Sequence, residues 1–167
     1  MREGPLAALA RAWRKPVEAC EHYQPNVGEW AHQRVRKRVR GHRATVFASA
    51  SSVVVELKGL ETSACFALGT PDRICGMNEP LEIDVPDLRL PLFTSPSERR
   101  AASAWLLAPG HAWMLARQRV RAGEALHVYR NAVVLTARHD RATGSCVEAL
   151  CDLADRLRVE PVAARGG

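Results

Sequence analysis

Short apolar runs rich in β-branched residues, separated by small polar turns, predict several β-strands. The clearest are residues 44–49 and 52–58, which are joined by a short polar tip, as in a hairpin. A second antiparallel pair is predicted at residues 126–130 and 132–139, with a tight reversal near Asn131. Residues 62–68 predict one further strand.

Residues 30–40 fit two structures. Asn26 and Glu29 have the spacing of a capping box, and Gly41 is a residue that commonly ends a helix. The strict alternation that follows favours a strand, because successive side chains then point to opposite faces. A strand places Val35, Lys37 and Val39 on one face. The four arginines lie on the other face: Arg34, Arg36, Arg38 and Arg40. We favour the strand.

Four segments have apolar residues at helical spacing, which predicts helices near residues 5–14, 96–107, 111–120 and 145–158. Ser95, Pro96 and Glu98 form a capping signature for the second of them, and Ser145 with Glu148 forms one for the fourth. Pro16 should end the first helix, with a short further helical turn over residues 17–22. Residues 1–25 are therefore expected to form a helical segment that docks on the domain or flanks it.

Four prolines between residues 69 and 91 predict an irregular crossing with short extended pieces at 81–85 and 88–92. Proline there favours the edge of a sheet, since it cannot donate a hydrogen bond to a ladder. Strands grouped beside helices, without strict alternation of the two, predict an α+β fold with a mostly antiparallel sheet. We expect one globular domain over residues 1–167, which is an ordinary domain length.

Composition supports a soluble, cytoplasmic protein without a transmembrane segment. The chain is 47% hydrophobic and 25% charged, and its apolar stretches fall far short of the roughly 20 residues that a bilayer requires. Basic residues interrupt any signal peptide near the N-terminus. The five cysteines are an odd number without a disulfide-scaffold spacing, which is typical of a reducing compartment. The N-terminal helix carries Trp13 beside basic residues, so contact with a membrane surface stays open.

Basic charge is concentrated in one place. The formal net charge is +6, and residues 34–43 contain six basic residues and no acid. Such a segment is typical of a contact with an acidic protein or a nucleic acid, and Trp30 or His32 would offer a stacking surface nearby. The alternative is a solvated face that keeps an edge strand soluble. The candidate contact residues are Arg34, Arg36, Arg38, Arg40 and Arg43.

Candidates for catalysis and metal binding are sparse. No nucleophile motif accompanies the candidate acid–base groups, which are His127, Tyr129, His139 and Asp140. Cys20 and His22 lack the second ligand pair of a zinc site. The proline-rich crossing contains a group of acids, but they do not have the spacing of a calcium-binding loop. These acids are Glu79, Glu82, Asp84 and Asp87. The sequence therefore predicts no cofactor and no metal.

The leading hypothesis is a non-enzymatic binding or assembly domain that contacts an anionic partner through a basic strand. One alternative is a small enzyme with a site near the 126–140 hairpin. Another is a homo-oligomer subunit that associates through an edge strand or through the helices that carry Trp105 and Trp113.

Overall fold

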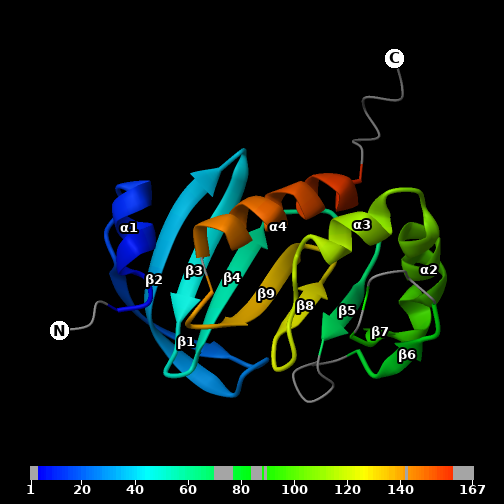
Figure 1. The fold of residues 1–167 in the computed structure, drawn as a ribbon, viewed down its shortest axis with the longest axis horizontal. Helices are drawn as coiled ribbons and strands as arrows, with labels where there is room; N and C mark the ends of the chain where they lie inside the picture. Colours follow the sequence, from blue (N-terminus) through cyan, green and yellow to red (C-terminus); the bar gives the residue numbers. More distant parts are fainter. Residues whose placement is uncertain (1–3, 70–76, 84–87, 89, 142, 160–167) are drawn as a thin grey trace.

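The computed structural model describes residues 4–69, 77–83, 88, 90–141 and 143–159. Its centre is an antiparallel nine-stranded sheet in the order β1-β2-β3-β4-β9-β8-β5-β7-β6, packed by helices (Figure 1). The strands are β1 (Glu18–Gln24), β2 (Glu29–Val39), β3 (His42–Ala48), β4 (Ser52–Lys58), β5 (Phe66–Gly69), β6 (Glu79–Leu81), β7 (Leu92–Thr94), β8 (Ala125–Val128) and β9 (Ala132–Arg138). The helices are α1 (Ala7–Trp13), the 3-10 turn η2 (Pro96–Glu98), α2 (Arg99–Leu107), α3 (His111–Ala116) and α4 (Thr143–Leu157). The predicted α+β class is confirmed.

One face of the sheet carries an apolar row that crosses eight strands in register. Directly paired residues in neighbouring strands point to the same face, so the row forms a continuous hydrophobic surface. It consists of Val35, Val46, Val55, Leu135, Leu126, Leu68, Leu92 and Leu81. Burial of this row against helices supplies the main hydrophobic contribution to folding.

Helix α4 covers the middle of that face, where it packs against β3, β4 and β9 (Figure 1). Its predicted apolar stripe is confirmed, because Val147, Leu150, Cys151, Ala154 and Leu157 are all buried. The helix begins at Thr143, two residues before the predicted N-cap at Ser145.

The β1–β2 hairpin reaches over part of the opposite face. The ring of His22 stacks on Phe47 of β3 with centroids 4.6 Å apart. Asn26, in the turn of the hairpin, lies 3.5 Å (Nδ2 to Nδ1) from His127 of β8. Beneath the hairpin lies a second, smaller apolar cluster of Ala31, Phe47, Val54, Ala132 and Val134.

The structure places residues 30–39 in strand β2, so the helical alternative is wrong, and Arg40 lies in the turn that follows. The helical turn expected over residues 17–22 is also wrong, because residues 18–22 lie in strand β1. Ser95 makes no side-chain capping bond, and the helix opens with a 3-10 turn instead. The Glu98 carboxylate is engaged by Arg130, so it does not complete the predicted capping box.

Proline marks a sheet edge as predicted, since Pro80 lies in β6, the outermost strand. The predicted extended pieces are shifted: β6 ends at Leu81 and β7 begins at Leu92. Val85, at the end of the first predicted piece, falls outside the described residues. Within the described part of the chain, no helix is long and apolar enough to cross a membrane.

Candidate anion-binding site

Strand register decides where the arginines of β2 point. Arg34, Arg36 and Arg38 are paired with Phe47, Thr45 and Arg43 of β3, so all six share one face. His42 of β3 lies on the other face, where its Nε2 is 2.7 Å from Asp155 of α4. The arginines therefore face away from α4, and the alternation seen in the sequence places three of them on one side.

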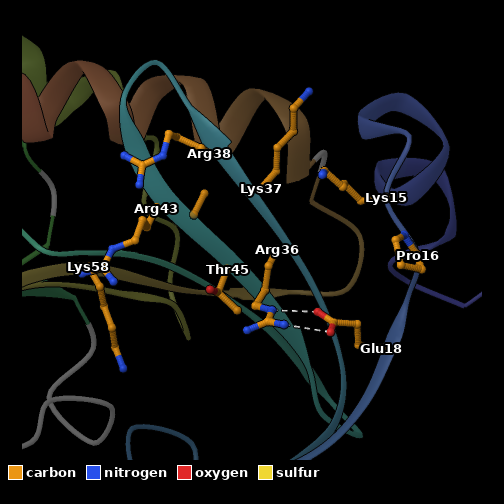
Figure 2. A pocket seen from close by; sticks show the side chains of 10 residues that line it. Lys15, Pro16, Glu18, Arg36, Lys37, Arg38, Arg43, Thr45 and Lys58 are labelled. Atoms are coloured by element: carbon orange, nitrogen blue, oxygen red, sulfur yellow. Dashed lines mark hydrogen bonds and ion pairs between the residues drawn. The ribbon is translucent and has the colours of Figure 1, made fainter.

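A groove of about 510 Å³ lies on this face, beside the start of β1 (Figure 2). Its lining contains one acid, Glu18, together with Pro16, Ala44 and Thr45. The remaining lining residues are all cationic: Lys15, Arg36, Lys37, Arg38, Arg43 and Lys58. Lys37 differs from the arginines of β2 in that the strand register places it on the opposite face of the sheet. We call this feature the basic groove. Its positive field would concentrate anions near β2, β3 and β4.

Glu18 neutralises part of that charge. Its carboxylate accepts two hydrogen bonds from Arg36, at 2.7 Å from Nε and 2.9 Å from Nη2. It also lies 3.7 Å from Nε of Arg34. The hydrogen bond from Arg36 lowers the pKa of Glu18, which keeps the carboxylate ionised. Arg34 and Arg36 are thus partly satisfied within the protein.

Arg38, Arg43 and Lys58 form a row across three adjacent strands. Arg38 is paired with Arg43, and Arg43 with Lys58 (Figure 2). Arg38 donates to the carbonyl of Gly41 at 3.2 Å, and the ammonium of Lys58 lies 3.3 Å from Glu56. Within the described residues, neither Arg38 nor Arg43 forms an ion pair with an acid. We call these three residues the cationic row.

Arg40 does not join the other arginines, which corrects the expectation from the sequence. It leads the β2–β3 turn with φ 51°, followed by Gly41 at φ 83°, as in a two-residue hairpin loop. Its guanidinium contacts Asp152 at 2.6 Å and Asp155 at 3.2 Å, both on α4. Because the strand ends at Val39, the alternation no longer governs the direction of this side chain.

Sequence reasoning missed Lys15 and Lys58 of the groove. Lys58 could have been found from the predicted hairpin of residues 44–49 and 52–58. Extending that pairing by one residue places Lys58 opposite Arg43, as the structure has it. No local pattern connects Lys15 with β2, because the two meet only through the path of the chain from α1 into β1.

The aromatic residues expected to stack beside the arginines lie elsewhere. Tyr23 and Trp30 are 47% and 55% exposed, and their ring centroids are 5.4 Å apart. Trp30 and His32 line a separate hollow of about 530 Å³, which shares no lining residue with the basic groove. The basic groove therefore has no aromatic side chain in its lining.

The candidate catalytic residues do not converge. His127 is fully buried and stacks on Tyr129, with centroids 5.5 Å apart. His139 lies beyond the end of β9, where its Nε2 is 2.9 Å from the carbonyl oxygen of Ser49. Asp140 pairs with Arg121 at 3.0 Å. The four groups thus divide between a buried stack and two separate surface contacts, so they form no common acid–base site.

Burial lowers the pKa of His127 to about 4, from an ordinary value of 6.5. The unfolded chain then takes up a proton below pH 6.5, while the folded chain does so only near pH 4. We therefore expect the free energy of unfolding to fall as pH drops through this window, by about 3 kcal/mol from this residue. Urea denaturation of the wild type and His127→Gln across the window measures the effect. Parallel curves for the two proteins would contradict it.

The described cysteines are poor nucleophiles. Cys20, Cys65, Cys146 and Cys151 are free thiols, and burial raises the pKa of each, that of Cys151 to about 11. Cys75 falls outside the described residues.

Metal-ligand types are also scattered. In the part of the chain that the structure describes, no three His, Cys, Asp or Glu side chains are grouped to hold a metal ion. Cys20 donates to the carbonyl of Ala31, and His22 pairs with Gln24. Of the acids in the proline-rich crossing, Glu79 pairs with Arg99 at 2.8 Å, while Asp84 and Asp87 fall outside the described residues.

The two tryptophans of the helical pair have different environments. Trp105 is buried against Phe66 and belongs to the core. Trp113 is 63% exposed, and the guanidinium of Arg117 lies 5.0 Å from its ring centroid. Only the second is available to an interface.

No protein-family model matches this sequence, and no curated protein does either. Among solved structures, the chain is similar to the crystal structure of the mycobacterial trehalose monomycolate transport factor A, TtfA. The TM-score is 0.60 at 14% sequence identity, with 92% of this chain and 94% of that chain covered. The similarity extends to the whole fold, and at this identity it describes the fold alone.

Proposed function

We propose that this chain is a non-enzymatic binding domain that receives an anionic partner in the basic groove. The observation that carries the proposal is a concave site of about 510 Å³ with six cationic side chains and one acid in its lining. Clefts lined by one sign of charge attract ligands of the opposite sign and hold them by direct pairing.

The position of the groove in the sheet supports a binding role over a purely protective one. Charged residues often protect an edge strand from pairing with another chain. The pairing of β2 with the edge strand β1 ends at Arg34, so Arg38 lies on a stretch of β2 that is paired only with β3. Arg43 and Lys58 lie on β3 and β4, which are paired on both sides there. Edge protection therefore gives a reason for Arg38 but none for Arg43 and Lys58.

The cationic row also carries an electrostatic cost. Like charges placed directly opposite each other on neighbouring strands destabilise a sheet. Arg38, Arg43 and Lys58 stand in that relation across two strand pairs. A bound anion would offset the repulsion, which is the arrangement expected of a site that functions when occupied.

The structural neighbour is described as a transport factor. A transport factor is therefore one protein with this fold, although a shared fold does not transfer the function or the ligand. The binding function is favoured over an enzymatic one because the candidate catalytic residues lie apart.

The test measures fluorescence anisotropy of a labelled polyglutamate peptide and a labelled single-stranded RNA at low and physiological salt. The wild type should bind at least one probe, and affinity should fall steeply with salt. Arg38→Glu/Arg43→Glu should abolish that binding while the circular dichroism spectrum stays unchanged.

The matched control is Arg100→Glu/Arg119→Glu, which changes the net charge equally at two exposed positions outside the groove. It should bind almost as the wild type does. Retained binding in the groove variant, or equal loss in both variants, would refute the proposal.

A further inference from the structure

The cationic row has the spacing of a site for several negative charges held close together. Neighbouring strands lie about 4.8 Å apart, so the three residues span roughly 10 Å across β2, β3 and β4. Arg38 and Arg43 are directly opposite each other, as are Arg43 and Lys58. Two anionic groups can therefore lie between successive members of the row, each contacted from both sides.

The central member is held in place by a glycine. Gly59 follows β4 with φ 77°, and the guanidinium of Arg43 lies against it. A Cβ at Gly59 would come within 2.7 Å of Nη2 of Arg43, so a side chain there would displace the guanidinium. Lys58 is exposed and has a surface pair with Glu56, whereas Arg38 is oriented by its hydrogen bond to the carbonyl of Gly41. Such preorganisation reduces the entropy lost on binding.

The chemistry of the lining favours phosphate. Arginine binds phosphate with two parallel hydrogen bonds, and a phosphate ester presents three acceptor oxygens with nearly two negative charges. Single-stranded nucleic acid sites combine their charge with aromatic rings on which bases stack. The basic groove has no such ring, and its volume of about 510 Å³ lies within the range of small-molecule sites.

We propose that the basic groove binds a ligand with two or more closely spaced phosphate groups, one between Arg38 and Arg43 and the next between Arg43 and Lys58. This inference rests on the anion-binding function proposed above and names the chemistry of its ligand. The phosphates belong either to a soluble molecule or to a lipid headgroup, which present the same groups to the row.

Isothermal titration calorimetry at constant ionic strength tests the proposal with tripolyphosphate, inositol hexakisphosphate and inorganic phosphate. The two polyphosphorylated probes should bind at least about tenfold more tightly than inorganic phosphate, because they contact two positions of the row. Arg43→Gln should weaken tripolyphosphate binding by roughly tenfold or more, the usual effect of losing hydrogen bonds to a charged group. Arg100→Gln, which removes the same charge outside the groove, should change it by less than about twofold.

Thermal unfolding separates a binding role of Arg43 from a structural one. Arg43→Gln removes a like-charge contact on each side, so the unfolding midpoint of the ligand-free protein should be unchanged or higher. A clearly lower midpoint together with unchanged affinity for tripolyphosphate would overturn the assignment of this residue to the ligand.

Vesicle co-sedimentation with phosphatidylinositol bisphosphate distinguishes the two sources of phosphate. Binding of the free probes supports a soluble ligand, and binding only to these vesicles supports a lipid headgroup. If the polyglutamate or RNA probe binds through Arg38 and Arg43 but no polyphosphorylated probe competes, the inference fails and the anion-binding function stands. If no anion binds at all, both fail.

Discussion

Glu124→Ala is expected to lower the free energy of unfolding by about 3–5 kcal/mol, the usual effect of breaking a buried ion pair. The Glu124 side chain is fully buried before β8 and accepts hydrogen bonds from the backbone nitrogens of Arg121 at 2.9 Å and Arg138 at 3.1 Å. It also lies 3.4 Å from Nε of both Arg121 and Arg141. Removing it leaves the two backbone donors without their acceptor and takes the ion-pair partner from the largely buried Arg141, as urea denaturation at neutral pH should show.

Asp140→Asn is the matched control for that measurement. Asp140 pairs with the same Arg121 at 3.0 Å, but its side chain is 68% exposed. An exposed pair contributes little, so the loss should be at most about 1 kcal/mol. Similar losses in the two variants would show that burial of Glu124 is not what makes it important.

Gly69→Ala is expected to lower the free energy of unfolding by about 3 kcal/mol, from steric overlap together with an unfavourable backbone angle. Gly69 ends β5 with φ 152°, directly opposite Ala125 of β8. A Cβ there would lie 2.6 Å from the carbonyl oxygen of Glu124 and 2.7 Å from Cα of Ala125. Both are backbone atoms, which cannot move aside without disturbing the β5–β8 pairing. Thermal or urea denaturation measures the loss.

Gly110→Ala separates the steric effect from the backbone effect. Gly110 has φ 84°, and a Cβ there would have no neighbour within 4 Å. Gly110→Ala should lower the free energy of unfolding by only about 1 kcal/mol, because alanine disfavours the left-handed backbone conformation. If Gly69→Ala costs no more than Gly110→Ala, the close approach of β5 to β8 does not constrain the fold.

Residues with a strong local pattern were predicted well. The 52–58 strand matches β4, and the 132–139 strand matches β9 to within one residue. The apolar stripe of α4 was equally clear, since amphipathic spacing reports directly on the buried face. Strand β1 was missed because its inward positions hold Glu18, Cys20, His22 and Gln24, which present no apolar alternation. Strands β6 and β7, of three residues each, are too short for any period to show.

The candidate site was predicted in part for the same reason. Alternation placed Arg34, Arg36 and Arg38 on one face, and this holds because a regular strand fixes side-chain direction locally. It failed at Arg40, where the strand ends and a left-handed turn sends the guanidinium to α4. The sequence also suggested that Trp30 and His32 lie beside the arginines. They line a separate hollow instead, because their position depends on the path of the whole chain.

Sequence by itself determined the α+β class, the amphipathic helix α4, the central strands and the local excess of positive charge. Each of these follows from side-chain periodicity or composition over a short stretch of chain. Only the tertiary structure decided that Arg38, Arg43 and Lys58 form one row, that Glu18 engages Arg34 and Arg36, and that Glu124 is buried. Those facts depend on strand order and register, which are set by contacts between residues far apart in the chain.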